Sequence, residues 1–356
     1  MSDRVVMSIV IPMFKAENRI AHALSTIIEQ GRKDIEIICV DDVSPDNQVA
    51  VVEKLQENNP AIRLIRNTRN LGPGGSTNAG IDAAVGDYIV IVHADDTLLP
   101  GALDSLLSHI ITETPDMVLI GCDEYRRGKI RSLTDDSLTN ELATHPGLLT
   151  AEADPRVLLW PPGPWSKVYR RAFLNEKGLR FPEGVFEDIP WSIHTTVHAE
   201  KITVLPGPIY RYVTAERDSS ITTTLTPRNL DRLNQIRLIR DGLAIPDLDP
   251  AVRQHISALV AVHLIWANRA AYKTLPPNTH EQFFLDSVAE LRWWHSIAPV
   301  SQDLATEPLM ATDTRNTFSD ALLSGSWKRW RNTQAREKTS RKMARLVRTI
   351  KVGKKT

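Results

Sequence analysis

The sequence predicts an α/β protein with a mostly parallel sheet flanked by helices, followed by a smaller all-helical domain. Short apolar strands alternate with amphipathic helices through the first hundred residues, acidic residues directly follow two of these strands, and long helical segments begin near Thr226. At 356 residues the chain exceeds one ordinary hydrophobic core. A large domain and a smaller one are therefore expected.

Four runs rich in Ile and Val predict buried strands in the first region, because each is too uniformly apolar for a sheet with one exposed face. The predicted strands cover residues 7–14, 35–42, 61–67 and 87–96. Apolar side chains at helical spacing predict helices over residues 17–30 and 47–59, between the first three strands. This βαβαβ order predicts right-handed crossovers and a doubly wound parallel sheet.

Acidic pairs end the second and fourth strands, at Asp41-Asp42 and Asp95-Asp96. The carboxyl ends of neighbouring parallel strands meet at one edge of the sheet, where α/β proteins bind ligands. Carboxylates at that edge suit a hard divalent cation that holds a diphosphate. A helix N-cap is the alternative for each pair, because Asp before a helix accepts hydrogen bonds from free backbone amides. Because the two acidic pairs lie at matching places after their strands, a ligand site is favoured over helix capping.

A glycine-dense segment over residues 70–80 leads into a helix. Such a loop could bring the backbone close to a phosphate or a sugar. It lacks the glycine spacing of a dinucleotide fingerprint and the Gly-Lys-Ser/Thr ending of a P-loop. A flexible turn is the alternative interpretation.

The second half of the chain changes character twice. A strand is predicted over residues 117–125, and the polar residues 126–160 indicate a long insertion over the sheet edge. Residues 181–191 then combine prolines, aromatic residues and a carboxylate pair. Apolar positions that recur at three and four predict long helices over 251–272 and 281–298, packed as a second domain.

An ordered set of motifs spans residues 7–223. It consists of Ile9-Val10-Ile11-Pro12, Val40-Asp41-Asp42-x-Ser44-x-Asp46, Asn70-x-Gly72 with Asn78-x-Gly80, Gly86-Asp87-Tyr88, Ala94-Asp95-Asp96 with Pro100, Pro164-x-x-Lys167-x-Tyr169, Phe186-Glu187-Asp188, and Tyr210-x-Tyr212 with Arg217-x-x-Ser220-Ile221-Thr222. In order and spacing this set resembles the inverting family 2 nucleotide-sugar glycosyltransferases of the Rossmann-like GT-A fold, of the kind that glycosylate cell-surface polysaccharides and teichoic acids. The resemblance implies a catalytic domain over residues 1–225.

The resemblance implies roles for residues at the sheet edge and in a later loop. Pro12 and Asp42 match positions that flank the nucleotide base, where a carboxylate can accept the imide hydrogen of a uridine nucleotide. Asp95 matches the ligand of Mg²⁺ or Mn²⁺ on the donor diphosphate. Arg217 lies in a loop that reaches the diphosphate, and an ordinary solvated arginine is the alternative. The implied donor-binding residues are Pro12, Asp42, Asn78, His93, Asp95, Arg217 and Ser220.

Asp188 matches the general base of this family, the carboxylate that takes the proton of the acceptor hydroxyl on the side opposite the diphosphate. The alternative is an acidic pair, Glu187-Asp188, that caps the helix from Ile189. Lys167 is open to a structural or an acceptor-side role.

His93 departs from the family pattern, because most relatives carry an acidic residue there. The change leaves Asp95 as the single strong metal ligand. A neutral histidine can still hydrogen-bond a ribose or ligate a metal. Thr77, where relatives often carry arginine, is a second departure, and it bears on base recognition.

Residues 226–356 carry no motif of this family, and we expect a helical domain over 226–325 and a basic tail over 326–356. The tail has 12 Lys or Arg residues against the single acid Glu337, so it carries a charge of +11 and the body −11. From Ser340 onward a helix would gather apolar residues on one stripe between cations, as a helix resting on an anionic membrane does. A disordered tail is the alternative. The acidic body and the lack of a groove-reading motif disfavour nucleic acid.

The sequence therefore predicts a metal-assisted, inverting glycosyltransferase. It would use Mg²⁺ or Mn²⁺ and a nucleotide-sugar donor, and its acceptor would be a glycan, a polyol phosphate or a lipid-linked molecule. The lack of a signal-peptide pattern or a spanning apolar stretch predicts a cytoplasmic protein, peripheral on the inner face of the membrane through residues 326–356. The helical domain offers an interface for an oligomer. The alternative function is a catalytically silent subunit that binds a sugar nucleotide or a glycan.

Overall fold

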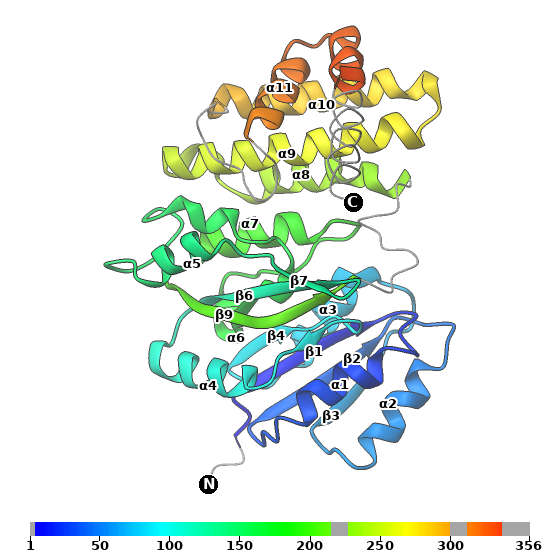
Figure 1. Ribbon diagram of the computed structural model, residues 1–356, viewed down its shortest axis with the longest axis vertical. Helices are drawn as coiled ribbons and strands as arrows, with labels where there is room; N and C mark the ends of the chain where they lie inside the picture. Colours follow the sequence, from blue (N-terminus) through cyan, green and yellow to red (C-terminus); the bar gives the residue numbers. More distant parts are fainter. Residues whose placement is uncertain (1–3, 215–226, 300–311, 337–356) are drawn as a thin grey trace, which may run out of the picture. The chain divides into compact units, whose positions relative to one another are not determined.

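The computed structural model describes residues 4–214, 227–299 and 312–336, and these fall into two compact units (Figure 1). The first unit comprises Met1–Ser220 with Leu238–Val252, and the second comprises Ile221–Arg237 with Arg253–Thr356.

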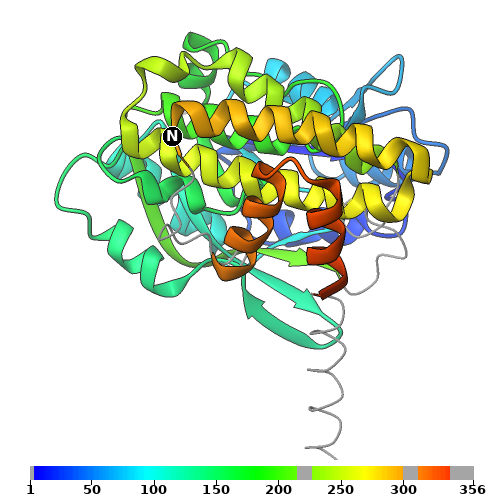
Figure 2. The same ribbon diagram turned by 90° about the horizontal axis from the view of Figure 1, so that it is seen from above.

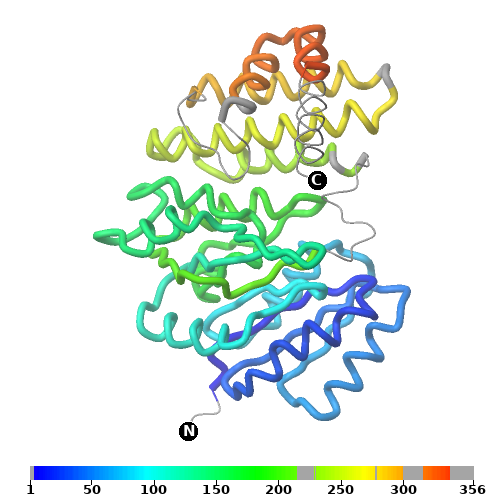
Figure 3. The backbone as a smooth tube through the Cα atoms, viewed as in Figure 1, coloured from blue at the N-terminus to red at the C-terminus, as the bar shows by residue number. Residues whose placement is uncertain are grey.

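The N-terminal part of the first unit is a parallel α/β layer, as predicted. Its strands pair in the order β3-β2-β1-β4, and all three pairings are parallel. The tube in Figure 3 shows the chain alternating between strand and helix through this part. The elements are β1 (Met7–Met13), α1 (Ile20–Ile28), β2 (Ile35–Asp41), α2 (Gln48–Gln56), β3 (Ile62–Arg66), α3 (Gly72–Ala83) and β4 (Tyr88–Ile91).

The later strands extend the same sheet with mixed pairing, in the order β4-β8-β6-β9-β5. β8 lies antiparallel to both β4 and β6, whereas β9 is parallel to β6. The elements are β5 (Thr97–Leu98), α4 (Ala102–Glu113), β6 (Met117–Arg126), β8 (Lys167–Arg170), α6 (Arg171–Glu176), α7 (Asp188–His198) and β9 (Ile202–Val213). The predicted α/β fold with flanking helices is confirmed. The predicted doubly wound parallel arrangement is present only in the N-terminal half of the sheet.

The predicted insertion over residues 126–160 contains regular structure. Its first part is β7 (Lys129–Ser132), which pairs antiparallel with β6 to form a hairpin. It continues through α5 (Asp136–Ala143) and the 3₁₀ turn η1 (Pro155–Leu159), and a second turn, η2 (Pro164–Ser166), leads into β8. The polar composition hid these elements because β7 is exposed along its whole length.

The glycine-dense segment is mostly helix α3 rather than a loop. Gly80 lies against the sheet, where a Cβ atom would come within 2.3 Å of Val10 Cγ1 and 3.3 Å of Val40 Cγ2. The missing side chain therefore lets α3 approach β1 and β2 more closely than any larger residue would allow. Both valines are completely buried.

The second unit is helical. It contains most of α9 (Pro250–Thr274), all of α10 (Pro277–Ile297) and α11 (Thr312–Leu323), and a further helical run over residues 327–336. α8 (Arg232–Gly242) precedes them, after η3 (Pro227–Asp231), and η4 (Ile245–Asp247) follows it. Among the described residues, no helix is long and apolar enough to cross a membrane.

The start of the predicted basic tail packs into this helical unit. Trp330 is 0% exposed, with its ring centroid 5.1 Å from that of Phe318 and 6.0 Å from that of Phe284. Trp327 lies 5.3 Å from the Phe284 ring. Figure 2 shows the run 327–336 beside α11. The amphipathic helix predicted from Ser340 lies outside the described residues.

Candidate functional site

Neighbouring strands deliver the predicted donor-binding residues to one edge of the sheet. β2 ends at Asp41, directly before Asp42, and β1 beside it carries Pro12 opposite Val40. β4 pairs with the other side of β1 and ends at Ile91, directly before Val92 and His93. Pro12, Asp42 and His93 therefore lie at the carboxyl ends of adjacent parallel strands, where a ligand can reach several of them.

Asp42 binds the start of α3. Its Oδ1 accepts hydrogen bonds from Leu71 N at 2.7 Å and Asn67 Nδ2 at 2.9 Å, and its Oδ2 accepts one from Gly72 N at 2.9 Å. The side chain is almost fully buried. Asp42 is thus an N-terminal cap for α3, supplied from another strand. Its contact with a nucleotide base stays a prediction.

Asp95 belongs to a group of three side chains that could hold a metal ion. His93, Asp95 and Asp96 each offer a ligand atom, and these atoms lie within 4.8 Å of one another. The His93 and Asp95 side chains are 32% and 24% exposed. Arg19, at the start of α1, lies 3.7 Å from Asp95 Oδ2. Two carboxylates and an imidazole fit a divalent cation that accepts both oxygen and nitrogen ligands.

Asp96 binds the end of β9. Its side chain is 0% exposed, and it accepts hydrogen bonds from the Tyr210 hydroxyl at 2.6 Å and from Val213 N at 2.8 Å. Burial and the Asp96 charge raise the pKa of Tyr210 well above its usual value, which keeps the hydroxyl protonated as a donor. Asp96 therefore fixes the strand that leads toward Arg217 and Ser220, both of which lie outside the described residues.

Asp188 is the first residue of α7 and is half-buried. The residue two positions earlier, Phe186, has φ of +69°, which is costly for a bulky side chain, and it is buried. This backbone turn sets the direction of Glu187 and Asp188 as the chain enters the helix.

The segment before Asp188 is fastened to α3. Asn78 Nδ2 donates to Phe181 O and its Oδ1 accepts from Phe181 N, both at 2.9 Å. One turn earlier, a Cβ atom on Gly74 would lie 2.8 Å from Glu187 Cγ and 3.0 Å from Phe181 Cβ. Asn78 thus positions the segment that carries the predicted base. Its contact with a donor stays a prediction.

Three tryptophans between η1 and α7 are largely core residues. Trp160, Trp165 and Trp191 are 2%, 8% and 1% exposed. Trp165 stacks on Tyr210 and Tyr212 at centroid distances of 5.1 and 5.3 Å. Trp191 stacks on Phe181 at 4.0 Å. These rings are therefore packed in the core.

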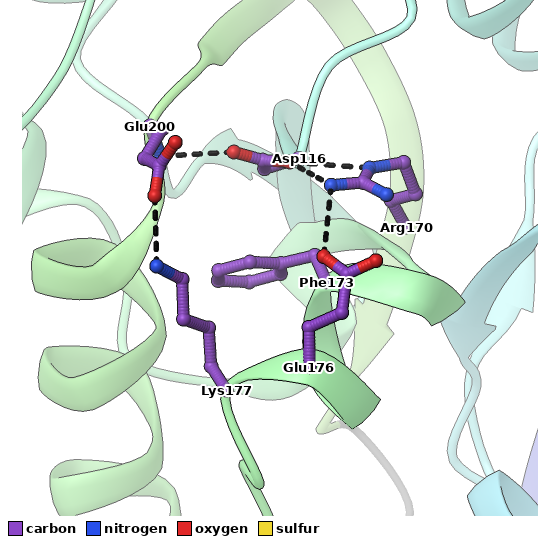
Figure 4. A pocket seen from close by; sticks show the side chains of 6 residues that line it. All are labelled: Asp116, Arg170, Phe173, Glu176, Lys177 and Glu200. Atoms are coloured by element: carbon purple, nitrogen blue, oxygen red, sulfur yellow. Dashed lines mark hydrogen bonds and ion pairs between the residues drawn. The ribbon is translucent and has the colours of Figure 1, made fainter.

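A polar pocket of about 170 Å³ lies at the opposite end of the strands (Figure 4). Asp116 precedes β6, and Arg170 pairs with the first residue of β4. The two side chains form an ion pair at 2.6 Å, and Lys177 pairs with Glu200 at 2.7 Å. These contacts hold α6 to the strand starts. They lie far along the sheet from the ends of β2 and β4.

Sequence reasoning missed the residues that position this site. It assigned no task to Tyr210, although the resemblance included Tyr210-x-Tyr212. It treated Phe186 only as part of a motif, and for Asp96 it offered a ligand site or a helix N-cap. The available signal was the Tyr210 motif, because a buried tyrosine hydroxyl usually has a hydrogen-bond partner.

Comparison with known proteins identifies the family of the N-terminal region. Residues 8–148 match the family model "Glycosyl transferase family 2". The uncharacterized glycosyltransferase YibD of Escherichia coli is 27% identical over 211 residues, which cover 58% of this chain and 60% of YibD. The poly(ribitol-phosphate) beta-N-acetylglucosaminyltransferase TarS of Staphylococcus aureus is 25% identical over 256 residues, which cover 70% of this chain and 43% of TarS.

A solved structure supports the fold. The crystal structure of S. aureus TarS 1-349 in complex with UDP-GlcNAc matches 94% of this chain with a TM-score of 0.73, at 18% identity, and 92% of that chain is covered. This likeness confirms the GT-A fold. The chain spans 60% of the length of YibD and 43% of the length of TarS.

We predict that Asn78→Ala loosens the segment before Asp188. Loss of both hydrogen bonds leaves the Phe181 N–H and C=O without that partner, so stability should fall by about 2 kcal/mol. Urea unfolding measures the loss, and amide hydrogen exchange should accelerate at Phe181. Asn47→Ala is the control, since Asn47 bonds Glu17 on the exposed surface. Equal effects of the two substitutions would contradict the prediction.

Proposed function

We propose that this chain, which contains a family 2 glycosyltransferase domain, transfers a sugar with inversion from a nucleoside diphosphate donor, a UDP-sugar, to an acceptor hydroxyl. One observation carries the proposal: α3 is bonded at its start to Asp42 and in its middle to the segment that carries Asp188. The donor edge and the candidate base are therefore fixed on a single helix.

Asp188 is the proposed general base. It is half-buried at the start of a helix, with its backbone set by Phe186. In an inverting displacement this carboxylate accepts the proton of the acceptor hydroxyl as the oxygen bonds the anomeric carbon and the nucleoside diphosphate leaves.

Pro12, Asp42 and Asn78 are the proposed donor-side residues on the sheet edge and α3, joined by His93 and Asp95 after β4. Arg217 and Ser220, outside the described residues, are proposed to bind the diphosphate. A divalent cation, when bound, would stabilise negative charge on the departing diphosphate. His93 and Asp95 would hold it, with Asp96 beside them. A ligand set with one imidazole suits Mn²⁺ better than Mg²⁺, which prefers oxygen.

The proposed acceptor is a glycan, a polyol phosphate or a lipid-linked molecule of a cell-surface polymer. TarS, by its name, acts on poly(ribitol phosphate), and 256 residues align with it. We place the enzyme in the cytoplasm, peripheral on the inner membrane face. Cations of the run 327–336 support this placement: Lys328, Arg329 and Arg336 line an open groove of about 430 Å³ beside α11.

A catalytically silent subunit that binds a sugar nucleotide is the second candidate. One observation favours it: the metal-binding group contains His93 where most relatives carry an acid, and Asp96 is engaged with β9. Turnover of the donor separates the two candidates.

We predict that the wild-type chain releases UDP from a UDP-sugar with Mn²⁺ and an acceptor, and that Asp188→Asn lowers kcat by about 10²- to 10⁴-fold. Donor binding, measured by thermal shift across a panel of sugar nucleotides, should survive this substitution. Asp136→Asn is the control, because Asp136 is an exposed acid in the first turn of α5. A wild type that binds donor without turnover would establish the silent subunit.

We predict that Asp95→Asn weakens donor binding in Mn²⁺ at least tenfold, with little change once EDTA is present, because the carboxylate acts through the ion. Calorimetric titration with UDP in both buffers measures this difference. Asp104→Asn, an exposed acid in α4, is the control. If the donor affinity of the wild type does not change when EDTA is added, the metal role is ruled out.

We predict that the wild type binds vesicles with 30% anionic lipid in a salt-sensitive manner, with each cation near the surface contributing about 1 kcal/mol. Deleting 326–356 would also remove the buried Trp330, so the cleaner variant is Lys328→Glu, Arg329→Glu, Arg336→Glu with residues 337–356 deleted. It should lose vesicle binding in sedimentation. The matched control reverses exposed Arg126, Arg127 and Lys129 of the β6–β7 hairpin. Retained binding by the first variant would refute the membrane role.

A further inference from the structure

Lys167 is a buried cation that the proposed mechanism leaves without a task. It begins β8 and is 0% exposed. Its ammonium donates hydrogen bonds to Pro161 O at 2.7 Å and Ser166 Oγ at 3.2 Å. Both acceptors are uncharged, and a buried ammonium is costly unless a negative group lies near it. The residues around Lys167 should therefore include a carboxylate.

The packing of β8 against α7 identifies that carboxylate. Trp191 Nε1 donates to the Tyr169 hydroxyl at 2.8 Å, and the two rings meet edge to face at 5.3 Å. Lys167 lies two residues before Tyr169, on the same face of β8. Asp188 lies one helical turn before Trp191, on the same face of α7. The same packing therefore places Lys167 and Asp188 on the facing surfaces of β8 and α7, and the Asp188 charge acts on the Lys167 ammonium.

Among the described residues, the titratable groups that act on Lys167 are Cys122 from β6 and Asp188 from α7. Burial raises the pKa of the Cys122 thiol well above its usual value, so this group stays neutral. Burial lowers the pKa of Lys167 to about 7, and Asp188 opposes this effect. Asp188 therefore supplies the negative charge that favours the protonated lysine.

We propose that Lys167 is the positioning residue of the general base: its buried ammonium faces the Asp188 carboxylate across the β8–α7 packing and, through its charge, keeps that carboxylate ionised and directed toward the acceptor hydroxyl. The inference rests on the proposed function, in which Asp188 is the base. The Pro161 carbonyl and the Ser166 hydroxyl hold the ammonium in place from the loop before β8.

The test is the pH dependence of kcat/KM in Lys167→Met and Lys167→Arg. A positive neighbour lowers the pKa of a carboxylate, so its removal in Lys167→Met should move the acidic limb to higher pH by about 1 unit or more. Above that limb the rate should return toward the wild-type value. Lys167→Arg retains the charge and should keep the wild-type limb. Lys177→Met is the control, because Lys177 pairs with Glu200 at the opposite end of the sheet. A rate loss that is uniform in pH would overturn the proposal.

A second measurement needs no turnover. The ¹³C carboxyl resonance of Asp188, assigned by its loss in Asp188→Asn, should titrate at higher pH in Lys167→Met. If Lys167→Met does not fold, the ¹⁵Nζ resonance of Lys167 provides the test instead. The pKa of Lys167 should fall below about 7 in Asp188→Asn, because the opposing carboxylate charge is lost. Shifted resonances in a chain without transferase activity would leave the pair intact and defeat the proposed function. Transferase activity with unshifted resonances would defeat the pair alone.

Discussion

Helix α3 is the element on which the rest of the candidate site depends. Its first amides are bound by the Asp42 carboxylate, and Gly80 brings it against Val10 and Val40. Its other contacts hold the segment that ends at Asp188, through the paired hydrogen bonds of Asn78 and the close approach at Gly74. Such a helix cannot shift toward one side without leaving buried polar groups unpaired on the other. The glycines, which suggest a flexible turn in the sequence, therefore allow the close contacts that hold α3 in place.

The parts of the fold that the sequence predicted are those governed by local pattern. Uniformly apolar runs predicted β1, β2 and β4, which are buried on both faces, and helical spacing predicted α1 and α2. β3 forms as predicted but lies at the edge of the sheet, where only Ile62 is buried, so the prediction of a buried strand was wrong there. The placement of Asp42 and His93 at one edge followed from the parallel pairing of their strands. The exposed strand β7 and the short β8 carry no such signal. Their pairing is decided by contacts distant in sequence, which is why the antiparallel half was not anticipated.

The positioning contacts were hidden for a related reason. Asp96 pairs with Tyr210 across 114 residues and Asn78 with Phe181 across 103, and no spacing rule links positions so far apart. The strained backbone at Phe186 is likewise invisible in a phenylalanine, since only glycine or asparagine would signal a positive φ. The family resemblance named most of these residues. It could not say whether each would touch a ligand or hold its neighbour.

The buried rings connect the two carboxylate groups of the site. Asp96 accepts from the Tyr210 hydroxyl, the Tyr210 ring stacks on Trp165 at 5.1 Å, and Trp165 directly precedes Ser166 and Lys167. One packed array therefore runs from the metal-binding group to the cation that faces Asp188. Because close-packed interiors accept few alternative arrangements, a change of ring size at Trp165 would disturb the end of β9 and the turn before β8 together. The distance between donor and acceptor groups is thus set by core packing as much as by the residues that face the site.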